Sequence, residues 1–132
     1  MTPLVAIWID HEKAVLAFAG EGHVETKTIH SDVAGHPHWS GSQEGGGEKK
    51  YEARHAQHLA RFYDDVIHEL ESAGSLHLFG PGEAKRELQE RLKHVKHLAQ
   101  LPVRIETSDR MTEAQVAAKA REQLLLLESR VR

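Results

Sequence analysis

Residues 4–9 read Leu-Val-Ala-Ile-Trp-Ile, an apolar run that the polar residues 10–13 end. A run that is apolar at every position and rich in β-branched and aromatic residues predicts a strand buried on both faces. Such a strand lies inside a sheet, where neighbouring strands and packed helices remove it from water. The chain is therefore expected to build a sheet around this segment.

The hydrophobic period predicts the remaining elements. Two further strand-like segments follow at hairpin spacing and predict an antiparallel meander, whose last strand has the polar composition of a sheet edge. Apolar residues later recur at three- and four-residue spacing, which is typical of amphipathic helices. The predicted strands are residues 4–9, 14–19, 23–30, 75–80 and 102–108. The first predicted helix is 51–73 and is ended by Gly74, and the second is 81–98 and begins with Pro81. A capping box of Thr112 and Gln115 begins the third.

This order (β-β-β-α-β-α-β-α) predicts an α/β fold with a mixed five-stranded sheet, in which the first strand is central and the last two are parallel to it. The length of 132 residues suits a single domain, residues 1–132. There is no cysteine, no signal-peptide pattern, and no apolar run near the ~20 residues that cross a bilayer. A cytoplasmic protein without a membrane partner is expected.

Residues 31–50 have neither a helical nor a strand period, and they contain five glycines and one proline. A loop of about 20 residues is longer than most connections in compact domains, which indicates either a functional or a disordered segment. The formal net charge of the whole chain is −3, so binding to nucleic acid would need a local basic patch.

Two such patches are present. The first lies where the long loop meets the first helix and consists of Lys49, Lys50, Arg54, His58 and Arg61. The last three of these are spaced to share one helix face. Acidic residues lie among them, so the alternative is a solvated face of mixed charge.

The second patch lies between Lys85 and Arg104, a stretch that contains six Lys or Arg residues and only two Glu residues. Lys93 and Lys96 are spaced away from the leucine stripe of the predicted helix and could neutralise phosphates without reading a sequence. The alternative is a set of long basic side chains that keep the surface soluble.

Metal-dependent chemistry has two weaker candidates. Asp10 ends the first strand, where ribonuclease-H-like nucleases hold a metal ligand, but such enzymes need several converging carboxylates. Asp64, Asp65 and Glu69 could contribute, although a hairpin turn explains Asp10 more simply. Histidines at positions 36, 38, 55 and 58 offer imidazoles without a carboxylate partner, so neither a metal site nor a cofactor is expected.

The stretches "GGGEKKYEARHAQHLARFYDDVIHEL" (45–70) and "HLFGPGEAKRELQERL" (77–92) resemble the middle domain of archaeal and eukaryotic peptide-chain release factors and of Pelota. The resemblance extends over nearly the whole chain in element order. It implies a sheet of the ribonuclease-H-like, translational-machinery-component type. In release factors the long loop carries Gly-Gly-Gln, which enters the peptidyl-transferase centre. Here the matching residues are Gly45-Gly46-Gly47, so glycine takes the place of the glutamine.

The resemblance implies a stand-alone relative that associates with the ribosome or tRNA, and the missing glutamine argues against peptidyl-tRNA hydrolysis. Ribosome rescue, hibernation or stress response are the implied roles, and a binding protein is favoured over an enzyme. The predicted RNA-binding residues are Gly45, Gly46, Gly47, Lys49, Lys50, Arg54, His58, Arg61, Lys93 and Lys96. The alternatives are a metal-dependent nuclease or peptidyl-tRNA hydrolase, and a protein–protein module that forms a homodimer through an edge strand such as residues 23–30.

Overall fold

The computed structural model describes residues 2–20, 22–31 and 47–131, with side chains except at 47–56 and 128–131. The elements in chain order are β1 (Leu4–Ile9), β2 (Lys13–Gly20), β3 (His23–His30), α1 (Gly47–His68), β4 (Leu76–Gly80), α2 (Ala84–Leu92), α3 (Lys96–Ala99), β5 (Val103–Thr107) and α4 (Glu113–Val131). No helix in these ranges is long and apolar enough to cross a membrane.

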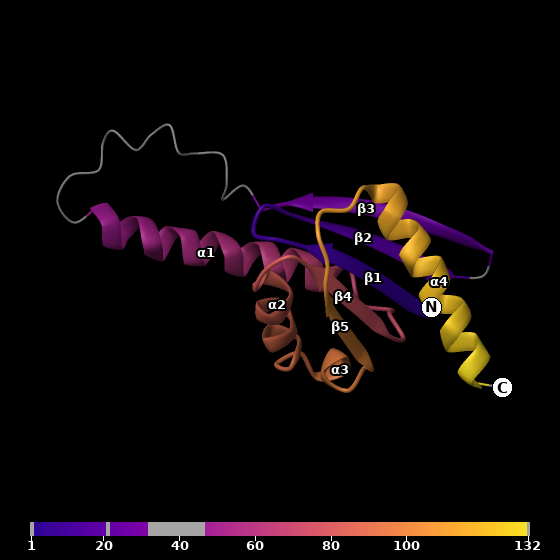
Figure 1. The fold of residues 1–132 in the computed structure, drawn as a ribbon. Helices are drawn as coiled ribbons and strands as arrows, with labels where there is room; N and C mark the ends of the chain where they lie inside the picture. Colours follow the sequence, from indigo (N-terminus) through magenta and orange to yellow (C-terminus); the bar gives the residue numbers. More distant parts are fainter. Residues whose placement is uncertain (1, 21, 32–46, 132) are drawn as a thin grey trace.

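The five strands form one mixed sheet in the order β3-β2-β1-β4-β5 (Figure 1). The first three strands are the predicted antiparallel meander, and β4 and β5 run parallel to β1. All six residues of β1 are buried, as expected for the central strand. The predicted α/β fold class is thus confirmed, and residues 23–30 lie at one edge of the sheet as predicted.

Helices cover both faces of this sheet. Val5, Ile7 and Ile9 of β1 pack into a core with buried residues of α1 and α2. The alternate residues Leu4, Ala6 and Trp8 form a second core with α4. Because successive side chains of a strand point to opposite faces, one apolar strand can serve two layers. The predicted need for burial on both faces is met by α1 and α2 on one side and by α4 on the other.

The first helix, α1, begins and ends earlier in the sequence than predicted. It begins at Gly47 rather than at residue 51, so part of the predicted loop is helical. The residues that follow Gly47 are Glu and Lys, which favour helices, and an acidic residue in the first turn suits the helix dipole. The helix ends at His68, five residues earlier than predicted, and continues as turns with Ala73 N–H donating to Leu70 O at 3.0 Å.

Gly74 therefore does not cap this helix. Its N–H donates to Thr2 O at 2.8 Å, beside the start of β1. A Cβ at this position would lie 3.1 Å from Pro3 O, tighter than nine in ten real Cβ contacts. The glycine permits the close approach of two backbone segments rather than the end of a helix.

The helix predicted over residues 81–98 is divided into α2 and α3. It begins at Ala84, three residues after Pro81. Val95 interrupts it with an extended backbone, at φ −109° and ψ 109°. Histidine and β-branched valine have weak helix propensity, and Val95 packs against the core in its extended form. The predicted inward residues Ala84, Leu88 and Leu92 are buried in α2.

The capping box predicted for the last helix is confirmed. Gln115 N–H donates to Thr112 Oγ1 at 3.1 Å, and Thr112 N–H donates to Gln115 Oε1 at 2.8 Å. These reciprocal bonds satisfy two donors that the first helical turn leaves without a partner. They set where α4 begins, so that Val116, Ala120 and Leu124 fall on the sheet.

Candidate nucleic-acid interface

The first helix extends past the sheet. Its carboxyl-terminal half packs on the sheet through the buried Phe62, Tyr63 and Val66. Its amino-terminal half projects beyond the ends of the strands (Figure 1). A helix of 22 residues is about 33 Å long at 1.5 Å per residue. The projecting half begins at Gly47 and carries four of the ten predicted RNA-binding residues, Gly47, Lys49, Lys50 and Arg54.

The predicted residues fall into three groups in this part of the structure. Gly45 and Gly46 lie outside the described residues. Gly47, Lys49, Lys50 and Arg54 belong to the backbone of α1, and their side chains lie outside the described part. His58 is half-buried and Arg61 is exposed, and no described residue forms an ion pair with Arg61.

The other two predicted residues lie on either side of the break between α2 and α3, with Lys93 directly after α2 and Lys96 at the start of α3. Lys93 and Lys96 are exposed, as are His94 and His97 beside them. No acidic residue lies between Glu90 and Glu106 in the sequence. Lys93 Nζ pairs with Glu90 Oε1 at 3.1 Å, whereas no described residue forms an ion pair with Lys96. The break in the helix turns this short basic segment to solvent.

The rest of the second predicted patch does not form one surface. Lys85 is buried, with its Nζ donating to Gly82 O at 2.6 Å. Arg91 pairs with Asp64 of α1 at 2.7 Å. Arg104 alternates with Val103 and Ile105, which pack on the α1 side, so it lies on the opposite face of the sheet. The patch is smaller than its sequence predicts because folding separates its members.

Two contacts hold α2 against α1. One is the Arg91–Asp64 ion pair, and the other joins Tyr63 Oη to Glu87 Oε1 at 2.5 Å. Burial, and then the Glu87 carboxylate, raise the pKa of Tyr63 above its ordinary value, so the hydroxyl stays protonated and donates. His11 Nε2 also lies 3.0 Å from Glu87 Oε1. These contacts tie α1 and α2 together on one side of the sheet.

The alternative of a metal nuclease finds no carboxylate cluster here. Asp10 Oδ1 accepts the backbone N–H groups of Glu12 and Lys13 at 2.8 and 2.9 Å, which is the turn role. Glu69 pairs with Lys27 at 2.8 Å, and Asp64 pairs with Arg91. Within the described ranges no three His, Asp or Glu residues are placed to hold a metal ion. The histidine loop at positions 36–38 lies outside those ranges.

Sequence reasoning missed a polar group on the α4 side of the sheet. His77 of β4 is 1% exposed, and its Nε2 lies 2.6 Å from Glu106 Oε1 on β5. Burial lowers the pKa of His77, which keeps the ring neutral near neutral pH. The available signal was a histidine inside the apolar strand Ser-Leu-His-Leu-Phe-Gly, where an apolar residue is normally expected.

At the level of sequence, no family model and no curated protein matches the chain. Among solved structures, Pelota of Archaeoglobus fulgidus is similar over 95% of this chain, with 19% identity and a TM-score of 0.54. Pelota of Thermoplasma acidophilum is similar over 86%, with 16% identity and a TM-score of 0.53. An archaeal translation termination factor matches over 97%, with 13% identity and a TM-score of 0.46.

This chain spans only 35% and 30% of the two Pelota chains. The similarity therefore concerns one part of Pelota. That part of Pelota has a fold similar to the fold of this chain. The predicted resemblance is thus met at the level of the fold, which this chain shares with a portion of Pelota.

Proposed function

We propose that this chain is an RNA-binding factor of the translation machinery that associates with the ribosome or with tRNA. The observation that carries the proposal is the long helix α1, whose basic amino-terminal half projects past the sheet directly after a glycine-rich segment. The fold shared with a portion of Pelota supports it, because the release-factor resemblance implies a role on the ribosome. A helix that extends beyond its own core can reach into a groove of a larger RNA.

The binding is electrostatic in this proposal. Lys49, Lys50, Arg54 and Arg61 contact phosphates along α1, and Lys96 with its neighbours makes secondary contacts. Such contacts carry no sequence information, which suits a factor that recognises a folded RNA by its shape. The net charge of the whole chain is negative, so attraction of phosphates depends on local groups of basic residues such as these.

The factor binds without hydrolysing peptidyl-tRNA. Gly47 stands where release factors carry the glutamine, and glycine has no side chain to help position an attacking water. Within the structure this glycine is the first residue of α1. A non-hydrolytic factor of this kind fits ribosome rescue, hibernation or stress response.

Co-sedimentation with ribosomes across a salt series tests the proposal. The variant Lys49→Gln/Lys50→Gln/Arg54→Gln/Arg61→Gln should bind more weakly at every salt concentration. The slope of log K against log salt should fall by about 0.7–0.9 for each phosphate that the variant no longer neutralises. The proposal would be refuted if the wild-type protein bound ribosomes at none of the salt concentrations, or if the slope of this variant equalled that of wild type.

A charge-matched pair separates local binding from net charge. Lys93→Gln/Lys96→Gln and Arg110→Gln/Arg121→Gln each remove two exposed positive charges. The proposal expects the first pair to reduce the slope and the second to leave it nearly unchanged. An equal reduction in both would mean that only the total charge matters, contrary to the proposed interface.

A further inference from the structure

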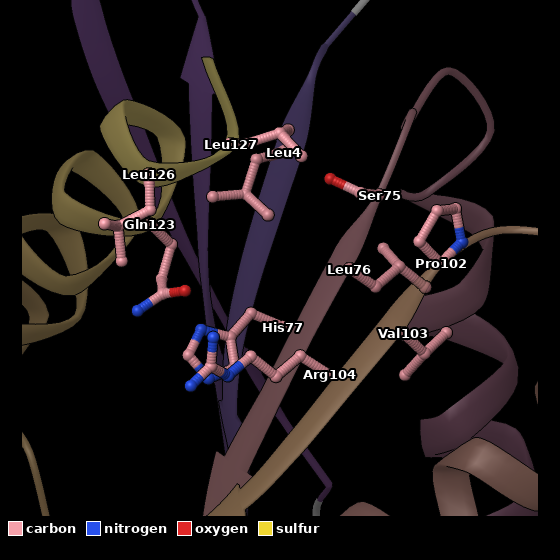
Figure 2. Close-up of a pocket in the computed structure, with 10 residues that line it drawn as sticks. All are labelled: Leu4, Ser75, Leu76, His77, Pro102, Val103, Arg104, Gln123, Leu126 and Leu127. Atoms are coloured by element: carbon pink, nitrogen blue, oxygen red, sulfur yellow. The ribbon is translucent and has the colours of Figure 1, made fainter. Parts of the chain in front are cut away.

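A cavity of about 320 Å³ opens on the α4 side of the sheet, away from α1 and α2. It lies between the amino-terminal ends of β4 and β5 and the later turns of α4 (Figure 2). It exists because α4 packs mainly on β1, β2 and β3, so the same face of β4 and β5 is less covered. This volume is at the lower end of the range for small-molecule sites.

One side of the cavity is polar. His77 of β4 and Arg104 of β5 are register partners on neighbouring strands, and Gln123 approaches from α4. Figure 2 shows the polar ends of these three side chains gathered together. They come from segments far apart in the sequence, and the parallel pairing of β4 with β5 brings the first two side by side.

His77 presents an unused acceptor. Its Nε2 faces the Glu106 carboxylate at 2.6 Å, and a carboxylate only accepts, so the neutral ring carries its proton on Nε2. Nδ1 is then a bare acceptor, and it is buried with no hydrogen-bond partner among the described residues. Native structures rarely leave a buried polar atom in this state, so it calls for a partner.

Arg104 presents an unused cation. It is exposed, and no described residue accepts a hydrogen bond from its guanidinium or pairs with it. Nearby Lys119 differs, because it pairs with Glu106 at 3.7 Å and with Glu122 at 3.8 Å. The Arg104 side chain lies beside the His77 ring (Figure 2). Because no hydrogen bond or ion pair to a described residue holds the Arg104 side chain there, it can move aside to admit a ligand to Nδ1.

The other side of the cavity is apolar. Leu4 and Leu127 line it, and so does Leu126, which is 47% exposed. Leu125 beside it is 62% exposed, and these two are the exposed large hydrophobic residues of the described chain. An apolar wall next to a free cation and a free acceptor is a surface for an amphipathic molecule.

We infer that this cavity binds a small carboxylate that carries an apolar side chain and an N–H or O–H donor next to the carboxylate. N-acyl amino acids and 2-hydroxy acids have this chemistry. Arg104 pairs with the carboxylate in the bidentate geometry that guanidinium favours. Nδ1 of His77 accepts from the ligand donor, Gln123 bonds the remaining polar atoms, and the leucines cover the apolar body.

Titration calorimetry with N-acetyl-L-leucine tests this site. Three probes each lack one feature: N-acetyl-leucine amide lacks the carboxylate, 4-methylpentanoate lacks the donor, and N-acetylglycine lacks the apolar side chain. Wild-type protein should bind N-acetyl-leucine at least about tenfold more tightly than the amide, as a charge-assisted hydrogen bond implies. Failure of wild-type protein to bind it at millimolar concentration overturns the inference.

Matched variants assign the roles. Arg104→Gln should weaken N-acetyl-leucine binding about tenfold or more, while Arg110→Gln, an exposed arginine outside the cavity, should not change it. His77→Phe should abolish the preference for N-acetyl-leucine over 4-methylpentanoate, which a merely structural effect would not do selectively. Binding by Arg104→Gln that equals wild type would refute the site. Because Arg104→Gln alters an exposed residue on the face opposite α1, its ribosome binding should be unchanged.

Discussion

Replacement of Gly80 by alanine should destabilise this protein more than any other glycine substitution in the described chain. Gly80 ends β4, at the point where the chain leaves the sheet for α2. Its φ is +156°, a conformation that residues with a Cβ rarely adopt. A Cβ built there would lie 2.2 Å from the carbonyl oxygen of Ile9, well inside the 3.0 Å limit of real contacts.

The size of the effect follows from what would have to move. Ile9 belongs to β1, which is paired on both sides and buried on both faces, so its carbonyl cannot retreat without separating the central strands. Backbone strain of this kind costs about 1–3 kcal/mol. The displaced packing around β1 adds to it, and mutations that disturb a tight core cost about 1–3 kcal/mol. The expected loss for Gly80→Ala is therefore roughly 3 kcal/mol or more.

Substitutions at two other glycines separate the effect of backbone strain from the effect of the clash with Ile9. Gly22 has φ +78° with open space around it, so Gly22→Ala adds backbone strain without a clash and should cost about 1–2 kcal/mol. Gly82 has neither a positive φ nor a neighbour within 4 Å, so Gly82→Ala should lie within about 0.5 kcal/mol of wild type. Urea unfolding followed by circular dichroism measures all three. If Gly80→Ala were no less stable than Gly22→Ala, the argument from the Ile9 carbonyl would be wrong.

Three further substitutions test single interactions by the same urea assay. Thr112→Ala removes the capping bond to Gln115 and should cost about 1 kcal/mol, with Thr112→Ser restoring most of it; a loss in the serine variant as large as in alanine would contradict this. Tyr63→Phe removes the bond to Glu87 and should cost about 1–2 kcal/mol, because the acceptor is charged; no loss would mean that water replaces the hydroxyl. Because burial lowers the folded-state pKa of His77, the unfolded chain binds its proton more readily, and the free energy of unfolding should fall as the pH drops below about 6.5. His77→Phe should lessen that fall, and an unchanged pH dependence would exclude the buried ring as its cause.

The strands were predictable because their signals are local. The continuous apolar run of β1 required burial on both faces, and the cores on either side of it supply that burial. The polar composition of β3 indicated a sheet edge, and it occupies one. In each case the period of two along a strand determines which side chains meet which layer, and this period can be read without knowledge of tertiary structure.

Helix limits were less predictable because tertiary contacts decide them. A glycine such as Gly74 is typical of a helix end, yet the helix ends at His68. Gly74 instead allows its backbone to lie close to the backbone of Pro3. Val95 fits the leucine stripe of a longer helix, but its packing against the core in an extended conformation ends α2 instead. A residue suited to two conformations takes the one that buries it, and the sequence alone does not rank the two.

The two candidate sites also differ in how far they could be predicted from the sequence. The grouping of Arg54, His58 and Arg61 on one helix could be predicted from their spacing, whereas Lys49 and Lys50 were expected in the loop and belong to α1 instead. The pair of His77 and Arg104 depends on the register of β4 against β5, which joins residues that lie 27 positions apart in the sequence and which no local pattern reveals. Their common face could still have been inferred in part, since Arg104 stands between two apolar residues of a strand. Because side chains alternate along a strand, Arg104 points to the opposite face from Val103 and Ile105. It therefore lies away from the other basic residues of the second predicted patch.

This separation has a functional consequence. The helix α1, which carries most of the proposed RNA contacts, packs with α2 on one face of the sheet, and the cavity lies with α4 on the other. Strands β1, β4 and β5 all pack against the core on the α1 side, so a ligand in the cavity could affect α1 only by moving these closely packed strands. Occupancy of the cavity is thus expected to leave RNA affinity unchanged unless the sheet itself moves. Ribosome binding measured with and without saturating N-acetyl-leucine would reveal such coupling, and a change in affinity would mean that the sheet is not a rigid partition between the two faces.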